Sequence, residues 1–487
     1  MKKKVKDGVT VFKVRLVGDG RTHTATDTYS ATPSKKEFLI LIHEAARYGW
    51  DIIHIDESRA FLNSKYMGNK KIYTKLRESR EYYEVVGALY GLRTSPKDYQ
   101  NTVKKRMVDN GYTDNVICPC IYYKEVDGYE VLVCIYVDDY IFTGSNTTVV
   151  LEEIRKLREQ VTTTDPIINP HKVLGLEIEY RRDQHCVLIT MKDKIHEVYD
   201  SFRNEDIRNR KSKLMPMPKD KYILEQNMED SNLNDKDKKY IEDTKLYMSI
   251  IGKLNWISTI RFDILLPLLY LSWHSQHPRE HHIKTALYLL DYLYDTINIP
   301  LVMGGLVTDP VGYSDASVGT GNKGRSIIAS ICKMNERAGA VDATTTSSNS
   351  VHLSSYTSEL EAATMTSRKL QEVRNICTVM KREIPEIIKM YSDNEAMISY
   401  IKGMATGKHA KSMMLHLYYL RENYERMDID IRHMDGNVIP TDKLTKLGTA
   451  KEHLMFVMDI MGLYMLPVDD PLFGNTSMFN QKEKDEA

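Results

Sequence analysis

Apolar residues in the first part of the chain recur with the two spacings that distinguish strands from helices. Runs of β-branched and aromatic residues predict strands at 11–17 and 50–56, and residues 129–143 predict a β-hairpin. Apolar residues three and four positions apart predict helices at 35–47 and 95–110. Short strands mixed with helices in this way are typical of an α+β domain.

The pattern changes twice further along the chain. Residues 147–203 still mix helix and strand, whereas 215–239 is rich in Pro, Asp, Asn and Lys and poor in large apolar residues, which is typical of a linker. A mostly helical block follows at 240–296, and strands alternate with helices again from 304 to 448. The polar residues 474–487 predict a disordered end.

These changes in composition and periodicity divide the chain into four expected parts. Their bounds are 1–214, 215–303, 304–450 and 451–487. The second part combines the linker with the helical block, and the last is a C-terminal tail. The chain of 487 residues is long enough for each of the larger parts to bury its own core.

Composition narrows the class of protein without naming a partner. Lys and Arg together number 67, as do Asp and Glu, so any electropositive groove has to be made by local clusters. The six cysteines form no CxxC pair, which indicates reduced thiols in an intracellular protein. No apolar stretch approaches the roughly 20 residues that span a bilayer, and the basic start lacks the apolar run of a signal peptide.

Two adjacent acids, Asp138 and Asp139, fall at the turn of the predicted hairpin 129–143. An ordinary solvated turn is one explanation, because Asp is common in turns. Asp56 ends another predicted strand and offers a third carboxylate at a strand tip. Hard carboxylate oxygens are the ligands of two-metal sites, in which divalent ions about 3.5–4 Å apart serve phosphoryl transfer. The three acids therefore predict a metal site.

The motifs around these acids resemble one family. Residues 136–139 (Tyr-Val-Asp-Asp) are similar to the Tyr-x-Asp-Asp box of reverse transcriptases, and 88–96 is similar to the Leu-Tyr-Gly-Leu-Lys-Gln-Ser-Pro element of copia-type LTR retrotransposons. The likeness starts at 13–17 and extends to about residue 448. It implies an α+β right-hand polymerase of fingers, palm and thumb over 1–214, followed by a linker and helical connection over 215–303.

The resemblance also implies roles for individual residues. Asp56 and Asp138 would hold Mg²⁺ or Mn²⁺, with Asp139 assisting. Phe61 would screen the sugar 2′ position and favour dNTPs, with burial in a core as the alternative. The remaining nucleotide-binding candidates are the phosphate-contacting Lys13 and Arg15 and, beneath the nucleotide, Tyr90 and Gly91. Plain surface exposure is the alternative for the two basic residues, and packing is the alternative for Tyr90.

A second set of acids follows residue 304. Asp315, Glu359, Asp393 and Asp442 are each unremarkable as surface carboxylates. With their flanking residues they resemble the RNase H domain that follows reverse transcriptase in copia-type elements. The likeness implies an α/β RNase H-like domain over 304–450, in which these four acids hold two ions. Glu361 is a fallback ligand, because Ser358 and Glu361 also fit a capping box.

Several positions depart from the family. Glu57-Ser58-Arg59 replaces a Val-Lys-Thr-like triplet beside Asp56, and 408–413 loses an acid and an arginine while keeping His409. The Gly-Asp that closes the first RNase H hairpin is absent around 317–321. Little sequence precedes Lys13, so we expect part of the fingers, and the protease and integrase of a full element, to be missing.

We therefore expect an RNA-directed DNA polymerase with RNase H activity. Its partners would be an RNA template, a DNA primer, the RNA–DNA hybrid and dNTPs, together with other retrotransposon proteins, and no membrane. It would act in the cytoplasm, within a virus-like particle, or in the nucleus. Two alternatives stay open: an inactive transposon remnant that folds and binds nucleic acid, and a protein that retains RNase H activity alone.

Overall fold

The computed structural model of the chain forms two compact units. Unit 1 comprises Met1–Leu41, Trp50–Pro170 and Val379–Lys381, and unit 2 comprises Ile42–Gly49, His171–Thr378 and Arg382–Ala487. Helix α1 (Lys35–Tyr48) begins in unit 1 and ends in unit 2. The residues that the structure describes are 2–6, 9–13, 17–20, 28–67, 71–75, 80–203, 212–218, 244–404, 411–475 and 479.

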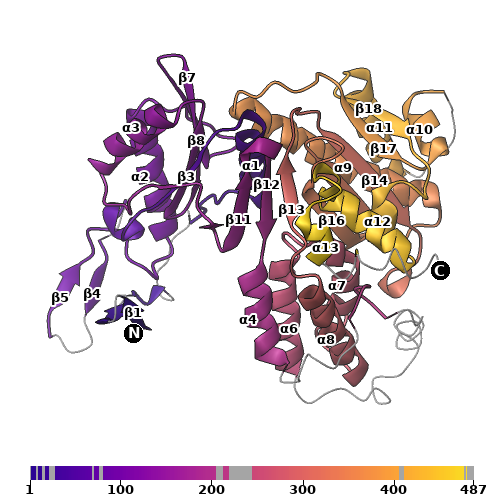
Figure 1. Cartoon of the computed structure of the whole chain (residues 1–487), viewed down its shortest axis with the longest axis horizontal. Coiled ribbons are helices and arrows are strands. Elements are labelled where there is room, and N and C mark those ends of the chain that lie inside the picture. The colour runs from indigo at the N-terminus through magenta and orange to yellow at the C-terminus, as the bar shows by residue number, and fades with distance from the viewer. Residues whose placement is uncertain are drawn as a thin grey trace. The chain divides into compact units, whose positions relative to one another are not determined.

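Unit 1 is built on a five-stranded antiparallel sheet in the order β6-β7-β8-β3-β9. Helices α2 (Ser95–Asp109) and α3 (Thr147–Arg158) lie beside this sheet (Figure 1). The strands are β3 (Ile52–Asp56), β6 (Ile121–Val126), β7 (Tyr129–Tyr136), β8 (Asp139–Gly144) and β9 (Ile167–Ile168). Two small hairpins, β1–β2 (Lys2–Lys6, Val9–Lys13) and β4–β5 (Tyr73–Lys75, Tyr82–Glu84), complete the strands described in this unit.

One core joins the sheet of unit 1 to its helices. Ile53 and Ile55 of β3 are fully buried and point to the same face, because side chains two apart in a strand share a face. Val103 of α2 and Ile154 of α3 belong to the same cluster. The predicted strand at 50–56, the hairpin at 129–143 and both helices are confirmed, and the α+β class with them.

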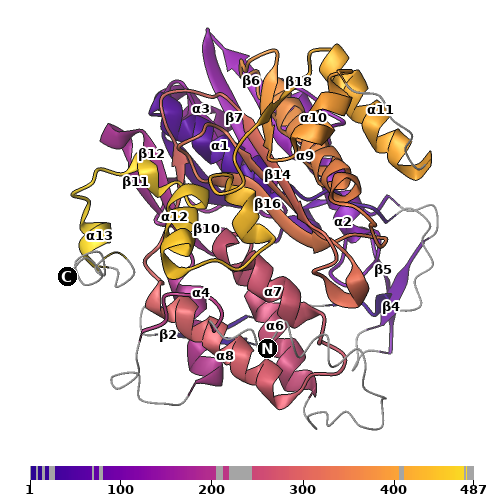
Figure 2. The same cartoon turned by 90° about the vertical axis from the view of Figure 1, so that its right-hand side faces the viewer.

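Unit 2 begins with a four-stranded antiparallel sheet and a group of helices. The sheet has the order β10-β11-β12-β13, made by Lys172–Val173, Leu176–Arg181, Cys186–Thr190 and Leu301–Gly304. Figures 1 and 2 show the helices side by side: α4 (Lys192–Phe202), α6 (Thr244–Ile257), α7 (Leu265–Ser272) and α8 (Glu280–Asp295). The predicted helical block at 240–296 is confirmed for the described residues 244–296. Residues 219–239 of the predicted linker 215–239, and 240–243 of the block, lie outside the described residues.

The second sheet of unit 2 is mixed, with the order β16-β15-β14-β17-β18. Its strands are Val311–Ser317 (β14), Ile327–Lys333 (β15), Ala340–Ser347 (β16), Ile388–Ser392 (β17) and Ile429–His433 (β18). The first three pair antiparallel, whereas β14–β17 and β17–β18 pair parallel. Helices α9 (Ser355–Val379), α10 (Glu395–Ile401) and α11 (Lys411–Glu425) accompany it. This arrangement confirms the expected RNase H-like fold.

Helix α9 lies so close to β14 that one strand position has no room for a side chain. A β-carbon on Gly312 would come within 2.8 Å of side-chain atoms of both Thr366 and Leu370. Ala316, Ile328 and Ala362 form a small cluster in the same interface. The glycine therefore sets the distance between the helix and the strand that carries Asp315.

Two expected boundaries differ from the structure. Leu301–Met303, assigned above to the helical connection, form a strand because their buried apolar side chains extend the sheet of β12. Residues 451–487, assigned to a tail, contain most of α12 (Ala450–Ile460), a 3₁₀ turn at Leu463–Met465 and α13 (Pro471–Asn475). Helix α12 buries Phe456, Val457 and Ile460, and its His453 Nε2 lies 2.9 Å from the hydroxyl of Tyr292.

None of the described helices combines the length and the apolar character that crossing a membrane requires.

Three histidine rings lie together where α7 leads into α8, with His274 stacked on His282 and His281 edge-on to it. The rings of His274 and His282 are 3.8 Å apart, and those of His281 and His282 are 4.0 Å apart. Burial, reinforced by the neighbouring histidines, lowers the pKa of His274 to about 4 and that of His282 to about 2, from an ordinary value of 6.5. These imidazoles are therefore neutral in the folded protein at neutral pH.

This stack predicts a loss of stability in acid. Below pH 6.5 the unfolded chain binds protons on these histidines and the folded chain does not. The free energy of unfolding therefore falls as the pH is lowered from 6.5 to about 4. Replacing His274 by Phe keeps a ring and removes the titration, and should reduce this loss by at most about 3 kcal/mol. Denaturant unfolding at several pH values measures it.

The exposed His277 in the same turn provides the control. His277→Phe should leave the acid sensitivity of the parent unchanged. Equal pH profiles for His274→Phe and the parent would contradict a role for the stack.

Candidate active sites

The register of one strand pair brings the first group of acids together. Strands β3 and β8 pair antiparallel with Asp56 directly opposite Asp139. Asp138 lies in the turn between β7 and β8, and its carbonyl accepts a hydrogen bond of 2.7 Å from the Glu57 amide. All three acids are partly exposed. The structure thus places the three expected carboxylates on neighbouring strand ends of unit 1.

The structure adds a residue to this first group that the sequence did not predict, the histidine His54. His54 Nε2 lies 2.7 Å from Asp139 Oδ1. His54 stands two residues before Asp56 on β3, so both side chains project from the same face of the sheet. This spacing was the signal available in the sequence. A basic or neutral ring at this point orients the Asp139 carboxylate and supplies it with a hydrogen-bond partner.

Glu57 does not enter the group, although its position beside Asp56 suggests that it could disturb the metal ligands. Strand alternation turns its side chain to the opposite face, where only 1% of the residue is exposed. There its carboxylate pairs with Arg106 at 2.8 Å. Arg59, the other suspect residue, is exposed and adopts a left-handed backbone with φ of 61°.

The expected nucleotide-binding residues have mixed outcomes. Phe61 is half-buried and makes edge contacts with Tyr90, at 4.9 Å between ring centroids, and with Tyr99, at 5.6 Å. Gly91 has φ of 94°, and a β-carbon there would lie 2.1 Å from the carbonyl oxygen of Gly18, so it has a backbone reason to be glycine. Lys13 ends β2 with its side chain outside the described residues, as is the whole of Arg15.

The second group of acids gathers at one end of the mixed sheet in unit 2. Asp315 on β14 and Asp393 after β17 each lie two residues beyond the paired residues Tyr313 and Tyr391, so they stand level on neighbouring parallel strands. Glu359 comes from the first turns of α9. Each of these three acids offers a ligand atom within 4.8 Å of the others, and they are the one such cluster among the described residues.

Close approach of these carboxylates is costly without a cation. Burial and the neighbouring acids raise the pKa of Glu359 well above its ordinary value of 4.5. Burial also raises the pKa of Asp315 and of Asp393. Glu359 Oε1 accepts a hydrogen bond of 3.2 Å from the Ala316 amide, whereas the buried Oε2 has no hydrogen-bond partner among the described residues. A carboxylate oxygen left in this way fits a divalent ion.

Asp442 lies beside this cluster but outside it. The 3₁₀ turn Pro440–Leu444 carries it, and its two oxygens are taken by Lys446 Nζ at 2.7 Å and Lys443 Nζ at 2.8 Å. The hydroxyl of Thr445 donates to Asp315, which ties the same turn to the cluster. The two lysines hold the pKa of Asp442 below its ordinary value, although burial opposes them. The structure thus brings together three of the four expected ligands.

Glu361 does not join the cluster, and it does not form the capping box that its spacing from Ser358 predicts. Helix α9 begins at Ser355, so Ser358 is inside the helix and no capping box forms there. Ser354 takes the capping position instead, 3.4 Å from the Thr357 amide. The Glu361 carboxylate lies 3.1 Å from His352 Nε2. His409 lies outside the described residues.

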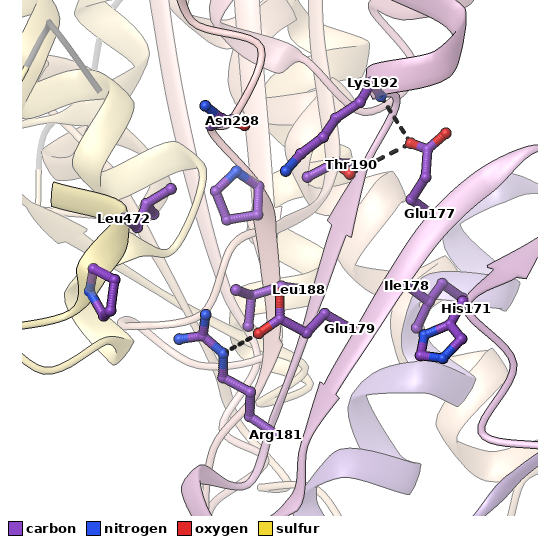
Figure 3. A pocket seen from close by; sticks show the side chains of 12 residues that line it. His171, Glu177, Ile178, Glu179, Arg181, Leu188, Thr190, Lys192, Asn298 and Leu472 are labelled. Carbon is purple, nitrogen blue, oxygen red and sulfur yellow. Dashed lines mark hydrogen bonds and ion pairs between the residues drawn. The ribbon is translucent and has the colours of Figure 1, made fainter. Parts of the chain in front are cut away.

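One cavity of unit 2 contains neither group of acids. It has a volume of about 690 Å³ and is lined by β11, β12, residues 298–300 and the start of α13 (Figure 3). The Glu177 carboxylate accepts a hydrogen bond of 2.7 Å from the Lys192 amide, and Glu179 pairs with Arg181 at 2.6 Å. The carboxylates of Glu177 and Glu179 thus already have hydrogen-bond partners in the cavity wall.

The chain is similar to known reverse transcriptases and transposon polyproteins. Residues 1–219 match the family described as reverse transcriptase (RNA-dependent DNA polymerase). The chain is 22% identical to the retrovirus-related Pol polyprotein from transposon TNT 1-94 of Nicotiana tabacum, over 90% of this chain and 33% of that protein. It is 21% identical to the corresponding polyprotein from transposon RE1 of Arabidopsis thaliana, over 89% of this chain and 29% of that protein.

Among solved structures, a foamy viral protease-reverse transcriptase in complex with double-stranded DNA is 14% identical, over 89% of this chain and 64% of that one, with a TM-score of 0.47. The chain spans about a third of the length of the two plant polyproteins. Residues 1–219 thus match the reverse transcriptase family, and about nine tenths of the chain is similar to the retrovirus-related Pol polyproteins of these two transposons.

Proposed function

We propose that the chain is an RNA-directed DNA polymerase with an attached RNase H activity. The observation that carries the proposal is the register of β3 and β8, which sets Asp56 opposite Asp139 beside the Asp138 turn, within the residues that match the reverse transcriptase family. The second group of acids, in a separate sheet, supports the second activity. Asp56, Asp138, Asp139, Asp315, Glu359, Asp393 and Asp442 would be the catalytic acids.

At the first group, the acids would hold the reacting groups of a primer and a dNTP in line. Bound Mg²⁺ or Mn²⁺ would activate the primer hydroxyl and stabilise the leaving pyrophosphate. Asp56 and Asp138 would be the metal ligands, and His54 would keep the Asp139 carboxylate oriented beside them. Phe61, braced by Tyr90 and Tyr99, would restrict the space at the sugar 2′ position.

At the second group, the acids would direct water to the RNA strand of a hybrid. Asp315, Glu359 and Asp393 supply the convergent carboxylates, and Thr445 fixes the orientation of Asp315. Asp442 would join them by exchanging one of its lysine contacts for the ion. The partners are then an RNA template, a DNA primer and their hybrid, held through phosphate contacts that weaken with added salt.

RNase H activity alone is the second candidate. It is favoured by one observation: among the described residues, only the second group brings three acidic ligand atoms within 4.8 Å of one another. In the first group, Asp139 is already bonded to His54. Under this candidate, substitutions in the first group would leave every measurable activity unchanged.

Primer extension and hybrid cleavage by single-site variants test the proposal. With Mg²⁺, the parent should extend a DNA primer on an RNA template and cleave the copied RNA. Asp138→Asn should reduce extension by a factor of roughly 10² or more, because it removes a metal ligand, and leave cleavage intact. Asp393→Asn should do the reverse.

The outcomes separate the candidates. Cleavage without extension in the parent would establish the RNase H candidate and reject the polymerase. A parent with neither activity above these two variants would reject both, leaving the inactive remnant. Binding of nucleic acid that persists in every variant is expected in all cases, because phosphate contacts do not need the acids.

Discrimination between sugars tests the role of Phe61. Phe61→Val would open space at the 2′ position, so incorporation of rNTPs relative to dNTPs should rise by a factor of roughly 10 to 100 while extension with dNTPs persists. Single-nucleotide incorporation kinetics measure the ratio. The exposed neighbour Leu62 gives the control, since Leu62→Val should leave the ratio unchanged.

The second group of acids should make the stability of the metal-free protein depend on pH. The folded protein holds a proton on Glu359 more tightly than the unfolded chain, so without metal its free energy of unfolding falls as the pH rises above about 4.5. Glu359→Gln should remove this fall and converge with the parent below pH 4.5. Thermal unfolding in the presence of a chelator measures it.

Added Mg²⁺ should reverse the effect in the parent at neutral pH. At about 100 times its Kd it should stabilise the parent by about 2.7 kcal/mol, with a smaller gain for Glu359→Gln. The exposed Glu383→Gln is the matched control and should respond as the parent does. An equal stabilisation of the parent and Glu359→Gln by Mg²⁺ would contradict the metal site.

A further inference from the structure

The carboxylate of Glu57 is the centre of a buried network beneath the first group of acids. Its Oε2 accepts hydrogen bonds from Arg106 at 2.8 Å, from the Tyr99 hydroxyl at 2.8 Å and from the Tyr140 hydroxyl at 2.7 Å. Its Oε1 accepts one from Asn63 Nδ2 at 2.8 Å. Burial raises the pKa of both tyrosines, so their hydroxyls stay protonated and remain donors at neutral pH.

Each acid of the first group is next in sequence to a member of this network. Asp56 precedes Glu57, and Asp139 precedes Tyr140. Asp138 follows Val137, whose carbonyl lies 3.0 Å from the Tyr99 hydroxyl. The network therefore reaches the backbone at all three positions.

The Asp138 turn needs such support. Val137 has φ of 57°, a left-handed conformation that a β-branched residue adopts only when the surrounding structure holds it there. Two contacts hold this turn: the Glu57 amide donates to the Asp138 carbonyl at 2.7 Å, and Tyr99 reaches the Val137 carbonyl. Both depend on where Glu57 lies.

The same network reaches the aromatic group expected to screen the sugar. Phe61 belongs to the 3₁₀ turn Ala60–Asn63, and Asn63 donates to Glu57. The ring of Phe61 packs edge-on against Tyr99, which is itself bonded to Glu57. A shift of Glu57 would therefore move both the acids and the ring.

Arg106 anchors this arrangement from α2, 49 residues along the chain. Its Nη1 contacts both Glu57 Oε2 and, at 3.0 Å, the Tyr140 hydroxyl. Both partners of the ion pair are almost completely buried. Stability alone does not require such a pair, because a well-packed apolar pair in its place is often as stable. The pair does fix directions, which an apolar contact does not.

We propose that Glu57 and Arg106 are positioning residues of the polymerase site, and that their ion pair sets the Asp138 turn, Asp139 and Phe61 in the geometry that nucleotidyl transfer requires. The inference rests on the polymerase activity proposed above. Glu57, which departs from the family pattern beside Asp56, would then help to position the residues of the site.

Four variants separate positioning from stability. Glu57→Gln and Arg106→Leu each break the pair, Glu57→Val with Arg106→Leu replaces it by an apolar pair, and Glu153→Gln is the control. Glu153 is the buried acid of another ion pair in unit 1, 2.5 Å from Lys124. Each variant is measured for thermal stability, for kcat and KM with dNTPs, and for the ratio of rNTP to dNTP incorporation.

The expected result is a split between stability and chemistry. Both single variants should lose stability, and the apolar pair should regain it while its kcat stays roughly 10 to 100 times below the parent, since small misplacements of reacting groups have effects of this size. Its ratio of rNTP to dNTP incorporation should rise. Glu153→Gln should lose stability and keep the kcat and the ratio of the parent. An apolar pair that regains both stability and kcat would overturn the proposal.

Mn²⁺ binding keeps this test independent of polymerase activity. In an Asp393→Asn background, which weakens the second group of acids, the parent should bind Mn²⁺ in a way that Asp138→Asn abolishes, measured by electron paramagnetic resonance. The apolar pair should weaken this binding roughly tenfold. If the parent extends no primer but the apolar pair still weakens Mn²⁺ binding, only the proposed activity fails. Unchanged Mn²⁺ affinity in the apolar pair would overturn the positioning role.

Discussion

Both groups of acids depend on one constraint: carboxylates that the fold brings near one another repel, and the fold has to supply compensation. The strand pairings that bring the acids together are set by apolar contacts on the buried faces of the sheets, such as those of Ile53 and Ile55. Hydrophobic burial therefore provides the free energy that gathers the charges. Polar neighbours then determine how each carboxylate is oriented and whether it is ionised.

The two groups meet this constraint differently. In unit 1 the acids are partly exposed, so water reduces their repulsion and His54 takes one oxygen of Asp139. In unit 2 Asp315 and Glu359 are buried, and protons are held more tightly there in the absence of a cation. Lys443 and Lys446 neutralise Asp442 at the edge of this cluster. Burial thus couples the protonation of Asp315 and Glu359 to the presence of a cation beside them.

Much of the fold and the positions of most of the acids could be predicted from the sequence, because periodicity and strand-end position depend on a few neighbouring residues. The hairpin at Asp138, the strand ending at Asp56 and the strand carrying Asp315 follow from patterns of a few residues. Contacts between residues that are distant in sequence do not follow from such patterns. The pairing of Glu57 with Arg106 and the docking of His453 against Tyr292 join residues 49 and 161 positions apart, and no periodicity indicates them. For the same reason the start of α9, and with it the surroundings of Glu361, follows from the cap at Ser354 rather than from the spacing of Ser358 and Glu361.

The departure at Glu57 illustrates how a substitution beside a site acquires its meaning from the fold. Read along the sequence, it adds a negative charge next to Asp56. In the structure, strand alternation sends that charge to the opposite face, where it would be destabilising by about 3–5 kcal/mol if it stood alone. That amount is a large fraction of the roughly 5–15 kcal/mol by which domains are stable. Arg106, Tyr99, Tyr140 and Asn63 all donate to it. An acid with four donors is compensated, so the site beside it keeps the geometry that the three aspartates need.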